Sequence, residues 1–135
     1  EQKRVSFKDI MGMSLAVKNG YKIAIISGEK NQIIDIIARK FNLTEVHKGI
    51  RNKLKVLEYI ASKYNLSMDE IVYIGDDIND IPCLNAVGTP VTVPEANYKV
   101  KQINNIQITT AKAGDGAFRE VVDSLLEVTS NQLCY

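Results

Sequence analysis

The sequence has no apolar run near the roughly 18 residues that a membrane-spanning helix needs, so we expect a soluble protein without a membrane span. An excess of one charge is also missing, because 17 basic side chains stand against 16 acidic ones and both kinds are scattered along the chain. A nucleic-acid or anionic-membrane surface would need clustered basic residues. We therefore expect neither partner.

Cysteine is scarce. Cys83 and Cys134 are the two in the chain, and they lie in unrelated contexts without metal-ligand spacing. The early part of the sequence also lacks the basic stretch and apolar stretch of a signal peptide. We therefore expect a protein of the reducing cytoplasm, with Cys83 as a core residue and Cys134 in a loose tail.

The composition is that of one globular domain. The chain has 135 residues, of which 45% are hydrophobic and 24% charged. This length allows one substantial core but not two. We expect residues 1–135 to form a single domain.

Short apolar runs alternate with stretches of apolar residues at helical spacing. The expected helices cover about residues 6–18, 33–41, 54–64 and 117–128. The expected strands cover residues 21–26, 45–47, 71–74, 87–93 and 106–109. This alternation predicts an α/β fold, a doubly wound parallel sheet with helices on both faces. Ligands of such sheets bind beyond the carboxyl ends of the strands.

Three carboxylates follow the strand expected at residues 71–74. Asp76, Asp77 and Asp80 fall within five positions, directly after Gly75. Crowded carboxylates repel one another, and a hard divalent cation, Mg²⁺ above all, relieves that repulsion. The alternative is that these residues only cap the helix expected from about Asn79, since Asp is a favourable N-cap residue.

Two other polar sites stand at similar places. Ser27 and Gly28 end the first apolar strand, where a hydroxyl and backbone amides could hold phosphate oxygens, although a plain loop would look the same. Lys53 opens the third expected helix, where the helix dipole favours negative charge. It either serves an anion there or is a solvated surface lysine.

The order and spacing of these sites resemble the haloacid dehalogenase superfamily. Lys53 follows Ser27 by 26 residues and precedes Asp76 by 23. Residues 25–28, 52–53 and 75–82 resemble the second, third and fourth motifs of that superfamily. The similarity covers about residues 5–126. It is closest to the cap-less 3-deoxy-octulosonate 8-phosphate phosphatase group and the related domain of acylneuraminate cytidylyltransferases.

The resemblance implies a Rossmann-like fold without a cap domain and a Mg²⁺-dependent phosphatase that works through an aspartyl-phosphate intermediate. Ser27 would hydrogen-bond the transferring phosphoryl group with the neighbouring Gly28, and Lys53 would neutralise it. Asp76 would bind Mg²⁺ directly, and either Asp77 or Asp80 would complete the metal shell. Such sites act mainly by positioning and charge stabilisation.

One family motif is absent. The Asp-x-Asp segment, whose first Asp attacks phosphorus, does not occur before Ser27, and Asp9 lies in a helical pattern instead. We expect that a central strand and the hairpin after it belong upstream of Glu1 in a longer polypeptide, or else that another segment fills this place in the sheet. Without that strand, the middle of the sheet would have unpaired backbone groups on both sides.

The substrate is expected to be a 3-deoxy sugar-acid phosphate. Glu29 stands where octulosonate phosphatases usually have Arg, and Glu29 with Lys40 resembles the members that act on nine-carbon nonulosonate 9-phosphates. Both residues are equally well explained as favourable charges at helix ends. His47 is expected to be structural.

The resemblance also implies a homotetramer, in which the polar tail at residues 129–135 could reach a neighbour's site. A rival interpretation is a non-catalytic, phosphatase-like oligomerisation module, which the intact Asp76, Asp77 and Asp80 argue against. A third, a flavodoxin-like nucleotide- or phosphate-binding protein, would need a glycine-rich loop after the first strand. The segment at residues 27–29 is too short and too acidic for that.

Overall fold

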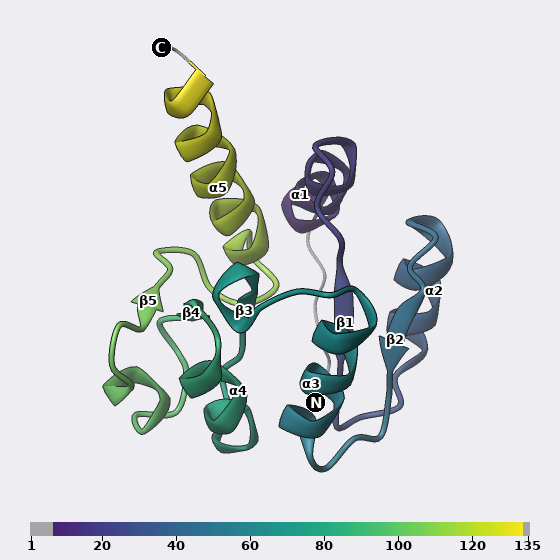
Figure 1. The fold of residues 1–135 in the computed structure, drawn as a ribbon, viewed down its shortest axis with the longest axis vertical. Helices are drawn as coiled ribbons and strands as arrows, with labels where there is room; N and C mark the ends of the chain where they lie inside the picture. Colours follow the sequence, from purple (N-terminus) through teal and green to yellow (C-terminus); the bar gives the residue numbers. More distant parts are fainter. Residues whose placement is uncertain (1–6, 134–135) are drawn as a thin grey trace. The chain divides into compact units, whose positions relative to one another are not determined.

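The computed structural model describes the backbone of residues 7–133 and the side chains of residues 8–127. The chain divides into two compact units (Figure 1). The larger one consists of residues 24–108, and the smaller one combines the segments before and after it. Across the described part of the chain, no helix is both long and apolar enough to cross a membrane.

The larger unit alternates strands and helices. Its strands are β1 (Ala24–Ile26), β2 (Glu45–His47), β3 (Val72–Ile74), β4 (Thr89–Thr92) and β5 (Gln107–Ile108). Its α-helices are α2 (Gln32–Lys40), α3 (Lys53–Lys63) and α4 (Ile81–Ala86). Short 3-10 turns are η1 (Met68–Glu70), η2 (Ile78–Asp80) and η3 (Val100–Gln102).

Every strand pairing in this unit is parallel, which confirms the predicted α/β class. β1 pairs with β2, and β3, β4 and β5 form a second sheet in that order. Among the described residues β1 has one neighbour, β2, and β3 has one neighbour, β4. The two sheets are therefore not hydrogen-bonded to each other within residues 7–133.

The first strand is shorter than predicted. It begins at Ala24 rather than at residue 21, and Tyr21 is exposed. Its partner β2 has three residues, so the ladder also covers three: Ala24 opposite Glu45 through Ile26 opposite His47. The preceding apolar residues have no strand to pair with in this ladder, and apolar character alone does not make a strand.

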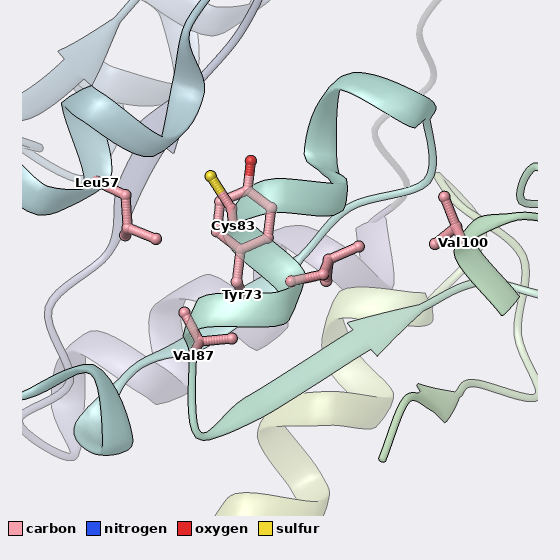
Figure 2. Packing of buried hydrophobic residues seen from close by; sticks show 6 residues of the cluster. Leu57, Tyr73, Cys83, Val87 and Val100 are labelled. Carbon is pink, nitrogen blue, oxygen red and sulfur yellow. The ribbon is translucent and has the colours of Figure 1, made fainter. Parts of the chain in front are cut away.

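The core of the larger unit lies around β3 and α4. Six buried residues form the cluster shown in Figure 2: Leu57, Tyr73, Cys83, Leu84, Val87 and Val100. Burying an aliphatic or aromatic side chain of this size stabilises a fold by about 1.5–3 kcal/mol. Cys83 is fully buried and unpaired, as its predicted role in the core requires.

Side-chain caps define where the helices of this unit begin. Asn31 caps α2 by accepting a hydrogen bond from the backbone of Ile33, and Asn52 does the same for α3 through the backbone of Lys55. A capped turn is also present, because Ser67 and Glu70 form a capping box around η1. These caps fix where each helix leaves its loop.

The smaller unit packs helix α1 (Phe7–Lys18) against helix α5 (Ala117–Leu133). Asp9 is buried, and its carboxylate accepts hydrogen bonds from the backbone N–H groups of Gly116, Phe118 and Arg119. A Cβ on Gly12 would lie 2.9 Å from the Arg119 Cα, so only glycine permits this approach of the two helices.

The last helix is longer than the sequence predicts. Helix α5 continues to Leu133, whereas the sequence favoured a loose polar tail from residue 129. The side chains of that tail, the residue Cys134 and the segment upstream of Phe7 lie outside the part of the chain that the structure describes.

Candidate functional site

Ser27 ties the loop after β1 to the loop after β2. Its side chain is buried, and its backbone N–H donates to His47 O at 2.9 Å while its own carbonyl accepts from Ile50 N at 2.9 Å. Its Oγ accepts from the backbone N–H of Glu29 at 3.1 Å. The Ser27 hydroxyl can therefore still donate a hydrogen bond to a ligand. It lies at the carboxyl end of a parallel strand, where the ligands of such sheets bind.

The loops after β1 and β3 meet at Gly28. A Cβ at that position would lie 3.6 Å from Ile50 O and 3.7 Å from the Asn79 amide nitrogen. Gly28 and Glu29 are both exposed. The structure thus brings the predicted Ser27 segment and the predicted carboxylate segment to one edge of the larger unit.

Lys53 joins the same edge from α3. Its ammonium nitrogen Nζ donates to Asp80 Oδ1 at 2.9 Å. The two side chains are only 10% and 6% exposed, so this is a nearly buried ion pair rather than a surface contact. The alternative that Lys53 is a solvated surface lysine is wrong.

The Asp80 carboxylate collects four hydrogen bonds. Oδ1 accepts from Lys53 and from the Tyr73 hydroxyl at 2.7 Å, and Oδ2 accepts from the backbone N–H groups of Asp76 at 3.1 Å and Asp77 at 3.2 Å. A Cβ on Gly75 would fall 2.6 Å from the Cβ and Cγ of Asp80, so the loop passes this side chain only because residue 75 is glycine.

Tyr73 is a neutral donor in this network. Burial raises the pKa of its phenol far above the ordinary value, and the neighbouring Asp80 carboxylate raises it further. The hydroxyl therefore keeps its proton at physiological pH and donates a hydrogen bond to Asp80 Oδ1. Burial likewise raises the pKa of the nearby Cys83 thiol, which leaves that cysteine protonated and unreactive.

Asp76 and Asp77 present their carboxylates at the surface of the same loop. Both residues are exposed, and Asp77 Oδ1 accepts from Ile78 N at 2.7 Å as the N-cap of η2. Asp77 therefore caps this turn as the alternative predicts, and a cap does not by itself exclude a role in metal binding. In the described part of the chain, no three His, Cys, Asp or Glu side chains form a group that could hold a metal ion.

Mg²⁺ needs fewer protein ligands than such a group supplies. It commonly takes one or two carboxylates and completes its shell with water and substrate oxygens. Asp76 and Asp77 fit that donor set because they are hard oxygen ligands on an exposed loop. Asp80 does not fit a direct role, since its two oxygens already accept four hydrogen bonds inside the chain.

Lys40 lies away from this edge, whereas His47 meets it through its backbone carbonyl, which accepts from Ser27 N. Lys40 ends α2, and the nine residues of that helix extend roughly 13 Å away from the loop that carries Glu29. The structure does not bring this pair together. The His47 ring nitrogen Nε2 donates to Glu45 Oε1 at 3.1 Å, so its role is the structural one that the sequence predicts.

The residue that sequence reasoning missed is Tyr73. It lies in a strand that reads as a plain apolar run, and its ring indeed joins the core. The tyrosine itself could have predicted this contact, because a buried hydroxyl needs a hydrogen-bond partner and Asp80 follows seven residues later.

The sequence and the fold of this chain are similar to those of known proteins. A family model described as haloacid dehalogenase-like hydrolase matches residues 15–121. The 3-deoxy-D-manno-octulosonate 8-phosphate phosphatase of Escherichia coli strain K12 is 28% identical over 134 residues, which cover 93% of this chain and 66% of the relative. The chain thus spans slightly less than two thirds of that protein.

Solved structures show the same similarity. A probable phosphatase from Pseudomonas syringae is 31% identical with a TM-score of 0.84, and the match covers 89% of this chain and 68% of that one. A Moraxella catarrhalis 3-deoxy-D-manno-octulosonate 8-phosphate phosphatase, in complex with magnesium, phosphate and KDO, is 28% identical with a TM-score of 0.88. That match covers 94% of this chain and 72% of the other.

Proposed function

Because this chain belongs to the haloacid dehalogenase-like hydrolase family, we propose that it forms the phosphate-binding part of a phosphatase for a 3-deoxy sugar-acid phosphate. The observation that carries the proposal is the nearly buried Lys53–Asp80 pair beside the loop of Ser27. A buried cation held at the carboxyl edge of a parallel sheet is suited to a phosphate group.

The chain's own residues supply positioning and charge. The Ser27 hydroxyl donates a hydrogen bond to a phosphoryl oxygen, and the Lys53 ammonium offsets the negative charge that gathers on the phosphoryl oxygens. Asp80 keeps Lys53 in place through their 2.9 Å contact. Because these groups are fixed before substrate binds, little reorganisation is needed when charge develops.

We also propose that the enzyme depends on Mg²⁺, with Asp76 and Asp77 as the carboxylates that hold it. When bound, the ion would neutralise phosphate oxygens and help to orient the phosphoryl group. Support comes from the exposed oxygen ligands of the loop after β3 and from the magnesium and phosphate in the Moraxella catarrhalis structure.

The nucleophile is proposed to lie on a further strand. β1 and β3 each pair on one side among the described residues, and a parallel strand between them would join the two sheets into one. An aspartate at its carboxyl end would attack phosphorus and release the sugar alcohol, and water would then hydrolyse the aspartyl phosphate. The matched relatives are longer than this chain, as such a segment requires.

The substrate is proposed to be octulosonate 8-phosphate or nonulosonate 9-phosphate. Relatives named for the eight-carbon compound support the first. Glu29 is exposed beside Gly28 and would contact the sugar acid, and its negative charge where octulosonate phosphatases usually have Arg favours the second. Lys40 has no part in this proposal.

The test measures phosphate release by the full-length protein from both sugar-acid phosphates, with Mg²⁺ and after chelation. Turnover of either substrate that disappears on chelation supports the proposal, and the preferred substrate defines the role of Glu29. A pure, folded protein that releases phosphate from neither contradicts it and favours the non-catalytic module. A homotetramer, which we propose for the active form, is checked separately by native mass spectrometry.

A further inference from the structure

Tyr73 connects the core of the larger unit to the candidate site. Its ring belongs to the buried cluster of Figure 2, with Leu57 and Cys83 among its members, and the residue is 9% exposed. Its hydroxyl donates to Asp80 Oδ1 at 2.7 Å, the oxygen that also accepts from Lys53. A phenylalanine would serve the packing equally well, so the hydroxyl needs another explanation.

The Tyr73 hydroxyl helps to hold the Asp80 carboxylate in one orientation. With Tyr73 and Lys53 on Oδ1, and the N–H groups of Asp76 and Asp77 on Oδ2, rotation of the Asp80 carboxylate would disturb all four contacts. Tyr73 is the partner anchored in a packed strand, whereas Lys53 has a flexible four-carbon side chain. The rigid partner defines where Oδ1 lies.

We propose that Tyr73 is a positioning residue: through Asp80 it sets the place of the Lys53 ammonium and of the Asp76–Asp77 backbone. Its catalytic consequence rests on the proposed phosphatase function. A small displacement of a charged group that acts on the transferring phosphoryl group costs rate rather than substrate binding. The positioning itself is a property of the folded chain and can be measured without turnover.

The experiment uses Tyr73→Phe in the full-length protein, with Tyr59→Phe as the matched control. Tyr59 is 55% exposed on α3, outside the network. In Tyr73→Phe we expect hydrogen exchange at the Asp76 and Asp77 amides to rise about tenfold, with exchange in the core of the unit unchanged. We also expect kcat to fall about tenfold while KM stays within about twofold. Tyr59→Phe should change none of these quantities.

The exchange and kinetic results separate the two claims. If exchange at Asp76 and Asp77 is the same in Tyr73→Phe as in the wild type, the positioning role is overturned, whatever the activity. If the wild-type protein has no phosphatase activity, the proposed function fails, while a local rise in exchange still supports the role of Tyr73.

A second variant covers the case in which Tyr73→Phe does not fold. A fluorinated tyrosine at position 73 keeps the ring and hydroxyl but makes the phenol a stronger donor. Exchange at the two amides should then slow relative to the wild type. Unchanged exchange in that protein would overturn the proposal.

Discussion

At the scale of single residues, the site depends on one buried ion pair. Moving two charges out of water is unfavourable unless they are paired and their remaining hydrogen-bonding groups are satisfied. Lys53 and Asp80 meet the first condition, and the two backbone N–H groups and the Tyr73 hydroxyl meet the second for the carboxylate. The cost of losing one partner should therefore be large.

We predict that Asp80→Ala lowers the free energy of unfolding by about 3 kcal/mol, because it leaves the Lys53 ammonium buried without its carboxylate. Lys53→Met together with Asp80→Ala should cost less than the sum of the single substitutions. Urea unfolding of the four proteins measures this coupling.

The matched control is Lys48–Asp35, a pair at 2.7 Å whose side chains are 32% and 46% exposed. Its coupling should stay below about 1 kcal/mol, because water and salt screen an exposed pair. Equal coupling energies for the two pairs would show that burial does not strengthen the Lys53–Asp80 contact.

Ser27 and Asp76 each follow a predicted parallel strand, and the carboxyl ends of such strands meet at one edge. The resemblance to the haloacid dehalogenase superfamily adds Lys53 to the same expected site. Spacing along the sequence cannot assign the three carboxylates their different roles. Asp80 points inward to Lys53 and Tyr73, whereas Asp77 caps a turn, and this division depends on side-chain directions that only the folded chain defines.

At the scale of elements, a second buried carboxylate holds α3 against β2. Glu45 is 5% exposed. Its carboxylate accepts hydrogen bonds from Lys63 at 2.6 Å, from the Tyr64 hydroxyl at 2.7 Å and from the His47 ring at 3.1 Å. These partners, Lys63 first, lower the pKa of Glu45 from about 4.5 to about 2. The carboxylate form is thus favoured in the folded protein.

This shift predicts a pH-dependent contribution to stability. A carboxyl with a lower pKa in the folded state stabilises the fold above about pH 4.5 and loses that contribution as the pH falls towards 2. The difference in unfolding free energy between wild type and Glu45→Gln should therefore be largest above pH 4.5 and shrink on acidification. A constant difference from pH 6 to pH 2 would contradict the assignment.

The smaller unit has its own capping carboxylate. Asp9 of α1 accepts three backbone hydrogen bonds at the start of α5, where the helix dipole also favours negative charge. Asp9→Ala should lower the free energy of unfolding by about 1–3 kcal/mol and raise hydrogen exchange at residues 116–119. Asp123→Ala, which breaks the exposed Arg119–Asp123 pair, should cost less than about 0.5 kcal/mol. Equal costs would contradict the buried cap.

Helices and strands could be told apart from the sequence because apolar residues recur at a different spacing in each. The residues at which they begin and end could not be predicted in the same way. Ile34 and Ile37 are buried on α2 as the helical spacing predicts. β1 is shorter than its apolar run because a strand ends where its partner ends. The turn after Asp77 begins as a 3-10 helix because the Asp77–Asp80 capping box tightens it.

At the scale of the whole molecule, the described chain contains two parallel sheets that share no hydrogen bonds, and it spans 66% of a curated relative. The side chains proposed to bind phosphate and the proposed metal ligands all come from the larger unit. A nucleophile from a further strand would complete the proposed phosphatase site. The central claim is therefore that Lys53 is the cation of a phosphate site.

The most direct test compares kcat for phosphate release by the full-length protein, its Lys53→Met variant and a Lys55→Met control. Lys55 is exposed two residues further along α3, so the control removes an equal charge outside the site. We predict that Lys53→Met lowers kcat at least about 100-fold, the cost of losing a fixed charge that stabilises the transition state, and that Lys55→Met stays within about twofold of the wild type. Wild-type kcat in Lys53→Met would contradict the account.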